Sequence, residues 1–356
     1  MTPKVQPPGK NNNRYLLFAS LSYSFSILRP LQDEIRRRGG EAAWFLEPSC
    51  ENGLEAGERL LVTIDEVMEY DPVAVFAPGN HVYHFFPGVK VQVFHGYAIN
   101  KRDDKNDDHF SIRGWFDVYC TQGPSSTPHF RELEKKYGFF KVYETGWPKV
   151  DPFFDGTPEL PRDRPCILYA TTFTRGITSA PEIYDTIEEM IRTKPWDWIL
   201  TLHPKLDDPE LVRRYRGLAE TYPHVTFQLP LEGIRTFRQI DAMLCDTSSI
   251  IIEIELLGKP VVTFRNTKPG PYVIDVREKE EIAPALERAL ERPQEVLDAM
   301  YAYTSYHEAH RDGRNSGRVL DAVDDFIANY RGRIKRKPLN LFRKLKLRKQ
   351  LGYHKR

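Results

Sequence analysis

Short apolar runs alternate with longer amphipathic stretches along most of the chain. The first run, residues 14–20, ends in small side chains, and a helical pattern, a Gly-Gly pair and a second apolar run follow it. Strand, helix and strand in this order begin a parallel sheet. The same alternation predicts the next elements, a helix at 64–70 and strands at 73–79, 89–96 and 115–123. We therefore expect a doubly wound α/β domain over residues 14–150, after a flexible leader at 1–13.

A Pro-rich connection separates this series from a second one. Residues 145–165 contain five prolines and two glycines, which no regular element could accommodate throughout. Beyond it the pattern predicts strands at 166–172, 196–204, 225–229, 242–249 and 260–264, with helices at 181–193, 210–222, 250–258 and between 281 and 330. We expect a second Rossmann-like domain over 151–330, closed by the last helices, so that two such domains face a cleft.

The composition is that of a folded protein without a membrane span. The 356 residues are 40% hydrophobic and 28% charged, and no apolar stretch approaches the roughly 18 residues that a spanning helix needs. The N-terminus lacks the apolar core of a secretory signal. The four cysteines are far apart and have no metal-ligand spacing. We expect buried thiols in a cytoplasmic protein.

Charge divides the chain into two unlike parts. Residues 331–356 hold 12 Lys/Arg and no Asp/Glu, whereas the preceding residues have a net charge of −11, within a total of +1. Leucine and phenylalanine are interspersed with these basic residues, which favours adsorption to an anionic membrane surface. Charge alone would also suit nucleic acid, but the tail has no aromatic stacking platform, so we expect no nucleic-acid partner. The expected location is peripheral, on the inner face of the cell membrane.

Two histidines follow apolar strands at their expected carboxyl ends, where open α/β sheets bind ligands. His95 comes after the run VQVF and before Gly96, which we expect to let the backbone turn. His203 ends the run ILTL and precedes Pro204. Such a histidine can be a satisfied structural side chain or a general base, because its unperturbed pKa of about 6.5 suits proton transfer at neutral pH. One histidine in each domain favours a joint role in the cleft.

An anion site is predicted where a later apolar strand passes into a helix. The residues at this junction are Asp246, Thr247, Ser248 and Ser249, and Glu253 follows about one helical turn later. One hydroxyl would suffice as a helix N-cap, which is the simpler interpretation. Three consecutive hydroxyls suggest contacts to phosphate oxygens, with Asp246 in a supporting role. Glu253 could accept hydrogen bonds from a ribose or lie solvated on the helix.

Arg175 and the remaining candidates carry less specific signals. Arg175 lies in a Thr-rich loop behind the strand at 166–172, where a guanidinium could bind a diphosphate or be an ordinary surface residue. The run 102–109 interleaves acidic and basic residues, which favours a solvated loop over a metal site. His81 and His84 could be metal ligands three residues apart, but no carboxylate motif accompanies them. No P-loop, GxSxG or GxGxxG motif is present. The sequence therefore indicates no metal and no required cofactor, and leaves magnesium dependence open.

The order of these motifs resembles the CDP-glycerol glycerophosphotransferase family, whose enzymes build teichoic-acid and related polymers. The matching segments span roughly residues 15–320 and are SYSFSILRPLQDEIRRRG, VFHG, TGWPKVD, ILYATTFTRG, LHP, DTSSIIIEIELLGKPVV and DGRNSGRV. The resemblance implies a GT-B fold and a CDP-alcohol donor held mainly by the C-terminal domain. It assigns the family's two histidines to His95 and His203, and its phosphate-binding hydroxyls to the residues 247–249. The DTSS segment is also similar to UDP-N-acetylglucosamine 2-epimerases, which would place Glu253 on the nucleotide ribose.

With this resemblance, the sequence predicts an enzyme that moves phosphoglycerol from CDP-glycerol to a glycan or lipid-linked acceptor in cell-envelope synthesis, releasing CMP. In this hypothesis His95 removes the proton of the acceptor hydroxyl, while His203, Arg175 and the DTSS segment stabilise charge on the diphosphate. Two alternatives stay open: a nucleotide-sugar glycosyltransferase or epimerase-like enzyme on the same fold, and a non-catalytic nucleotide-binding scaffold. The choice between CDP-glycerol and CDP-ribitol is also open at this point.

Overall fold

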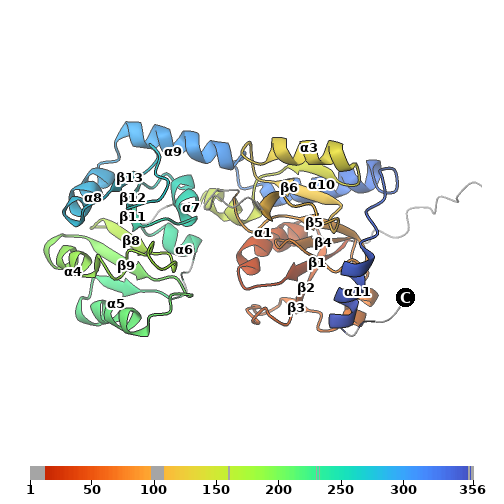
Figure 1. Cartoon of the computed structure of the whole chain (residues 1–356), viewed down its shortest axis with the longest axis horizontal. Coiled ribbons are helices and arrows are strands. Elements are labelled where there is room, and N and C mark those ends of the chain that lie inside the picture. Colours follow the sequence, from red (N-terminus) through yellow and green to blue (C-terminus); the bar gives the residue numbers. More distant parts are fainter. Residues whose placement is uncertain are drawn as a thin grey trace, which may run out of the picture. The chain divides into compact units, whose positions relative to one another are not determined.

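The computed structural model describes residues 13–97, 108–158, 161–229, 231, 233–351 and 353, and it divides the chain into two units (Figure 1). Unit 1 combines the residues up to Asp155 with those from His307 onward, and unit 2 is Gly156–Tyr306. Each unit has its own hydrophobic core. All of the predicted leader except Asn13 lies outside the described residues.

Unit 1 is built on a parallel sheet. Its described residues form seven strands in the order β3-β2-β1-β4-β5-β6-β7, a doubly wound arrangement as predicted. The strands are β1 (Arg14–Ala19), β2 (Glu41–Leu46), β3 (Arg59–Leu60), β4 (Ala74–Ala77), β5 (Val89–Gln92), β6 (Val118–Thr121) and β7 (Lys141–Glu144). The helices are α1 (Ser24–Arg37), α2 (Ile64–Tyr70), α3 (Thr127–Tyr137), α10 (Asn315–Asn329) and α11 (Leu341–Gln350), with 3-10 turns η1 (Asp108–Phe110) and η2 (Pro148–Phe154). Strands β4 to β6 are buried along their whole length, because a parallel sheet carries helices on both faces.

Unit 2 repeats this plan with a smaller sheet. Within the part of unit 2 that the structure describes, six parallel strands have the order β10-β9-β8-β11-β12-β13. They are β8 (Cys166–Ala170), β9 (Asp197–Thr201), β10 (Val225–Phe227), β11 (Ala242–Cys245), β12 (Val261–Phe264) and β13 (Ile274–Val276). The helices are α4 (Tyr184–Thr193), α5 (Pro209–Thr221), α6 (Ile234–Phe237), α7 (Ile250–Leu256), α8 (Ile282–Leu290) and α9 (Gln294–His307), with the 3-10 turn η3 (Lys279–Glu281). The four cysteines of the chain are buried free thiols, as predicted.

The division of the chain differs from the predicted one at both ends of the second domain. The first boundary falls after Asp155, inside the Pro-rich connection but beyond the expected residue 150. The second falls at His307, so that α10 belongs to unit 1 and does not close the domain expected over 151–330. The prediction was wrong here because helical periodicity shows that a helix is amphipathic and not which sheet it covers.

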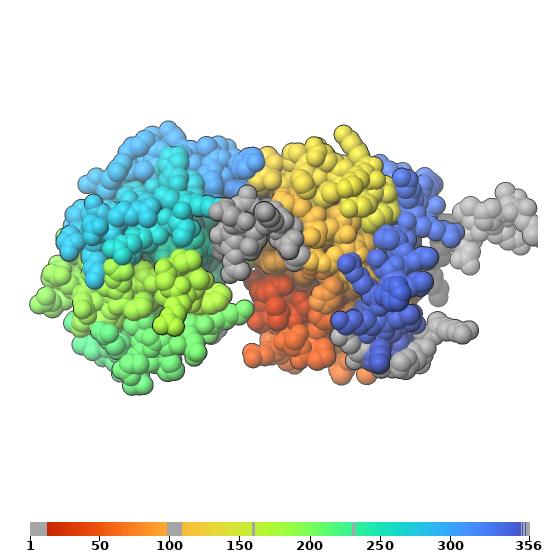
Figure 2. Space-filling model, viewed as in Figure 1, coloured from red at the N-terminus to blue at the C-terminus, as the bar shows by residue number. Residues whose placement is uncertain are grey.

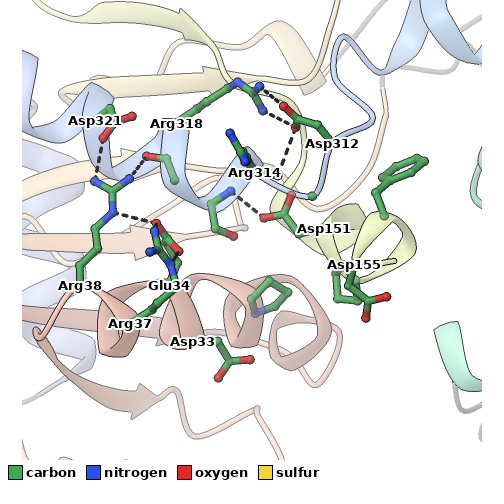
Figure 3. A pocket seen from close by; sticks show the side chains of 16 residues that line it. Asp33, Glu34, Arg37, Arg38, Asp151, Asp155, Asp312, Arg314, Arg318 and Asp321 are labelled. Atoms are coloured by element: carbon green, nitrogen blue, oxygen red, sulfur yellow. Dashed lines mark hydrogen bonds and ion pairs between the residues drawn. The ribbon is translucent and has the colours of Figure 1, made fainter. Parts of the chain in front are cut away.

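Hydrogen bonds to a buried carboxylate explain why α10 packs on unit 1. The amides of Asn315 and Ser316, in the first turn of α10, each donate to the Asp151 carboxylate at 2.7 Å (Figure 3). Arg38, just after α1, donates to the Gly317 carbonyl at 3.0 Å. The segments TGWPKVD and DGRNSGRV, far apart in the sequence, therefore meet here and attach the last helix of the body to the first domain.

The basic tail also differs from the prediction, because much of it packs on unit 1. Figure 2 shows the segment around α11, in blue, on the surface of this unit. Lys337 forms an ion pair with Asp117 at 2.7 Å, and Leu347 and Leu351 pack against the core of unit 1. The stretch expected as a separate tail at 331–356 is thus, over its described part, an extension of the first domain.

Candidate active site

A small cavity in unit 1 lies where the sheet changes winding direction. The chain leaves β1 toward β2 on one side and reaches β4 on the other, which is the switch point at which open α/β sheets bind ligands. The cavity has a volume of about 310 Å³. Its lining comes from the segments that follow β1, β2, β4 and β5, and consists of Ser20, Leu21, Tyr23, Glu47, Ser49, Gly79, Asn80, His81 and His95. One of the two predicted histidines is therefore part of this cavity.

His95 lies just beyond the carboxyl end of β5 and is exposed. Its ring is tilted against that of Tyr23, with 5.6 Å between centroids. Burial raises the pKa of the Tyr23 phenol, which therefore stays protonated at neutral pH. The imidazole is held beside a hydroxyl group while it stays accessible to a ligand.

The turn that presents His95 is made by the residue before it. Phe94 has a φ of +60°, in the left-handed region, and its side chain is buried. The Trp147 indole donates to the Phe94 carbonyl at 3.2 Å and so helps to hold this backbone conformation. The backbone bends at His95 and Gly96, but Gly96 does not have a positive φ. Its carbonyl accepts a hydrogen bond from Gln122 at 2.8 Å.

Sequence reasoning missed a second polar group in the same cavity. His81 Nε2 lies 2.9 Å from both carboxylate oxygens of Glu47, so this nitrogen carries the proton and donates. Glu47 follows β2 and His81 follows β4, so the rule that selected His95 by its place after a strand could also have selected them. His84, considered together with His81, points elsewhere: it accepts from Arg348 at 3.4 Å, and burial lowers its pKa to about 4.

His203 occupies the corresponding place in unit 2, beyond the carboxyl end of β9. Its Nδ1 accepts the Lys205 backbone N–H at 3.1 Å, so in the neutral ring the proton is on Nε2. The ring lies against Phe173, with 4.4 Å between centroids. This arrangement fixes His203 as a hydrogen-bond donor through Nε2, which suits a phosphate oxygen better than it suits proton abstraction.

Asp246 organises the loop that carries Arg175. Its buried carboxylate accepts from the Thr172 amide at 2.9 Å and from the Ser179 amide at 3.1 Å, and these two residues bracket the loop after β8. Burial raises the pKa of Asp246 to about 6, and the donated hydrogen bonds oppose this shift. Arg175 is exposed at the tip of the loop. Asp246 therefore acts on this region through the loop and not through a ligand.

The three hydroxyls after Asp246 are used differently from one another. Thr247 Oγ1 accepts the Thr267 amide at 3.0 Å, and Ser248 Oγ accepts a backbone N–H at 3.4 Å. Ser249 is the N-cap residue of α7, but its side chain makes no capping hydrogen bond and is exposed. Glu253 is buried on α7 and is not a solvated helix residue. Ser248 therefore caps α7 through the amide of its first residue, Ile250, whereas Thr247 is bonded to Thr267 and the Ser249 side chain makes no capping hydrogen bond.

Other candidates are structural or lie outside the described residues. Most of the acidic run, 102–107, is outside them. No group of three or more His, Cys, Asp or Glu side chains within the described ranges could hold a metal ion. In the same part of the chain, no helix is both long and apolar enough to cross a membrane.

A cavity of about 960 Å³ lies between α1, η2 and α10 of unit 1 (Figure 3). Three of the four arginines that line it form ion pairs within unit 1: Arg318 with Asp312 at 2.6 Å, Arg38 with Glu34 and Asp321 at 2.7 Å each, and Arg37 with Glu34 at 2.6 Å. The Arg318 hydrogen bond lowers the pKa of Asp312 to about 2. These three arginines serve contacts within unit 1, and the Arg38–Asp321 pair joins the end of α1 to α10.

Comparisons with known proteins agree with this architecture. No family model matches the chain. The teichoic acid ribitol-phosphate primase of Bacillus spizizenii is 24% identical over 346 aligned positions, which cover 82% of this chain and 81% of the relative. The structure of the wall teichoic acid polymerase TagF matches with a TM-score of 0.59 at 15% identity, over 90% of both chains. A UDP-N-acetylglucosamine 2-epimerase from Listeria monocytogenes, itself described as putative, matches with a TM-score of 0.59 at 14% identity, over 89% of this chain and 97% of its own.

These likenesses extend over both units of the chain. The solved structures confirm the predicted GT-B fold, with a Rossmann-like sheet in each unit. The curated relative matches across about four fifths of both sequences, so the likeness is not confined to one domain. These likenesses agree with the resemblance of the chain to the CDP-glycerol glycerophosphotransferase family of teichoic-acid-type enzymes.

Proposed function

We propose that the protein transfers phosphoglycerol from CDP-glycerol to a hydroxyl of a glycan or lipid-linked acceptor in cell-wall polymer synthesis, with release of CMP. The likeness to a teichoic acid ribitol-phosphate primase supports a transferase. The observation that carries the finer proposal is the placement of the two histidines. Each lies beyond an interior strand of its own sheet, His95 in a cavity with hydroxyl and carboxylate neighbours and His203 as an oriented donor.

In this proposal the acceptor binds in the unit 1 cavity. His95 is exposed there and can accept the proton of an acceptor hydroxyl. Glu47 and His81 lie in the same lining. The Glu47 carboxylate can accept hydrogen bonds from neighbouring hydroxyls of a polyol or sugar, and the His81 ring can also bind these hydroxyls. Their role is to position the acceptor, because the proton needs only one base.

The donor diphosphate binds in unit 2. His203 Nε2–H donates to a phosphate oxygen, and Arg175 supplies a planar cation on the loop that Asp246 holds. The hydroxyls of residues 247–249 complete the anion site, and Glu253 accepts from the ribose. The side chains proposed here provide charge stabilisation without a metal ion.

The proposed reaction is an in-line displacement at phosphorus. The acceptor oxygen loses its proton to His95 and forms a bond to the β-phosphorus, which carries the glycerol. The bond between this phosphorus and the bridging oxygen breaks, and the bridging oxygen leaves with CMP. The negative charge that develops on this leaving group is stabilised by His203 and Arg175.

The decisive experiment identifies the nucleotide that is released. Purified protein is incubated with CDP-glycerol, CDP-ribitol or UDP-N-acetylglucosamine, with bacterial envelope membranes as the acceptor source. CMP from CDP-glycerol is the expected product. Release of UDP would indicate glycosyl transfer, epimerised sugar would indicate the epimerase alternative, and no turnover of any donor would favour a non-catalytic scaffold.

Histidine variants test the roles within the site. His95→Ala should lower the transfer rate by at least about 100-fold, whereas His129→Ala, an exposed histidine on α3 of the same unit, should leave it unchanged. His203→Asn keeps an acceptor for the Lys205 amide but loses the Nε2 donor, while His203→Gln can restore a donor there. Near-normal transfer by His95→Ala would refute the base assignment.

Ribitol phosphate is the second candidate for the transferred group. The curated relative is named a ribitol-phosphate primase, so the same chemistry with a longer polyol has specific support. The two donors share the CDP moiety and differ only in the alcohol. A kcat/KM for CDP-ribitol that exceeds the value for CDP-glycerol would replace the first candidate with the second.

A further inference from the structure

Helix α11 has two unlike faces, and only one of them packs on unit 1. Residues 344, 347, 348 and 351 recur at helical spacing and are partly buried. Phe342 and Leu345 lie on the other side and are 91% and 63% exposed, and Leu341, at the border between the two faces, is 59% exposed. Leu339, just before the helix, is 72% exposed. The leucines of the tail therefore belong to two separate surfaces.

The inner face is fixed by several contacts with unit 1. Leu347 and Leu351 pack against the core, and Arg348 lies over the Phe85 ring at 5.5 Å. Tyr353 stacks on Phe85 with 4.4 Å between ring centroids. Just before the helix, the Asn340 side chain donates to a backbone carbonyl of unit 1 at 2.9 Å. These contacts hold the helix in one orientation with the other face outward.

The outer face combines apolar and basic side chains. Its four large apolar residues, Leu339, Leu341, Phe342 and Leu345, are among the most exposed hydrophobic side chains described. Arg343, Lys346 and Lys349 are exposed between them, and α11 contains no acidic residue. Burying Phe342 in water-excluding surroundings is favourable, while the neighbouring cations need an anionic partner.

We propose that this outer face of α11 adsorbs to the surface of an anionic lipid bilayer, with the four apolar side chains inserted among the headgroups. Exposed leucine and phenylalanine beside lysine and arginine, on a helix without acidic residues, match the chemistry of such a surface. This inference goes beyond the proposed transfer reaction, because it concerns where unit 1 is held and not what it catalyses.

The position of the helix would bring the unit 1 cavity close to the bilayer. His81 lines the cavity, and Phe85, four residues later, lies beneath α11 in contact with Arg348 and Tyr353. Four residues span at most about 14 Å of chain. A lipid-linked acceptor in the bilayer that α11 contacts would thus have its hydroxyl near His95.

The test measures vesicle binding by the full-length chain. Wild type should float with vesicles of phosphatidylglycerol and phosphatidylcholine and bind poorly to phosphatidylcholine alone. Phe342→Ser with Leu345→Ser should weaken binding to the anionic vesicles by at least about tenfold. Both side chains are exposed, so the thermal unfolding of the variant should match wild type.

Two control variants separate the contributions. Val62→Ser with Met68→Ser removes two other exposed apolar side chains of unit 1, 71% and 38% exposed, and should leave vesicle binding unchanged. Arg343→Gln with Lys346→Gln should weaken binding to anionic vesicles by about fivefold for each charge. Added salt should reduce the difference between this pair and wild type.

Three results would overturn the proposal. The first is equal binding of anionic vesicles by wild type and by the Phe342 and Leu345 variant. The second is loss of binding in the charge variant only, which would show adsorption without insertion of this face. The third is absence of vesicle binding together with tight, salt-sensitive binding of a single-stranded oligonucleotide. None of these measurements requires catalytic activity, so they do not depend on the proposed reaction.

Discussion

Replacing Asp246 with asparagine tests whether a buried carboxylate controls the loop of unit 2 that carries Arg175. The carboxylate accepts the amides of Thr172 and Ser179, and burial raises its pKa to about 6. The folded state therefore holds its proton more tightly than the unfolded state, in which the pKa is about 3.9. Because the folded pKa is the higher one, stability is lost as pH rises through this window. Asparagine stays neutral and has no such dependence.

The magnitude follows from the two pKa values. At about 1.4 kcal/mol per pKa unit, the full penalty for ionising Asp246 is about 3 kcal/mol, of which about 2 kcal/mol falls between pH 4.5 and 7.5. Asparagine also leaves the Ser179 amide without a carboxylate oxygen, a loss of about 1–3 kcal/mol that does not vary with pH. The free energy of unfolding of unit 2, measured with urea across this range, should thus decline more steeply in wild type than in the variant.

The same variant should also weaken donor binding. A loosened loop would displace Arg175, so the KM for CDP-glycerol should rise more than the KM for the acceptor. Parallel stability curves for wild type and Asp246→Asn would refute the pKa argument. An unchanged donor KM would refute the link between the carboxylate and the donor site.

Three further predictions concern unit 1. Asp151→Ala leaves two buried first-turn amides of α10 without their acceptor and should destabilise unit 1 by about 2–4 kcal/mol, measured by thermal unfolding. Burial raises the pKa of Glu308 to about 8, so the stability of Glu308→Gln relative to wild type should rise between about pH 5 and pH 8, and a constant difference would contradict this. Gly79→Ala places a methyl group 3.2 Å from a hydroxyl oxygen in the unit 1 cavity, and should raise the acceptor KM by about 3–10-fold without changing the donor KM.

The sequence predicted the two sheets well because their strands are short apolar runs between helical patterns. The run 166–172 became β8, and the helix at 64–70 became α2 with the same bounds. Strand β7 was not predicted, since only one of its four residues is buried and it offers no apolar run. The attachment of α10 also depends on tertiary contacts, through the Asp151 carboxylate and two amides that no local pattern shows.

The sequence could predict which residues of the candidate site follow strands. It could not predict the contacts that these residues make within the site. His95 and His203 could be selected because they follow apolar runs directly. The Glu47–His81 pair joins two residues 34 positions apart, and its existence depends on β2 and β4 both lying beside β1. Likewise, the left-handed backbone at Phe94 has no glycine to indicate it and is held by Trp147 from another part of the chain.

The packed position of α11 changes how the charge asymmetry of the chain should be understood and tested. From the sequence, the 12 basic residues of 331–356 suggest a removable tail behind an acidic body. In the structure, Lys337 is paired with Asp117, and the inner leucines complete the core of unit 1. Deleting the tail would therefore break an ion pair and expose apolar surface around Phe85, so lost membrane binding could reflect a damaged domain. Substitutions confined to the outer face of α11 leave these contacts intact, and only they can assign the binding to that face.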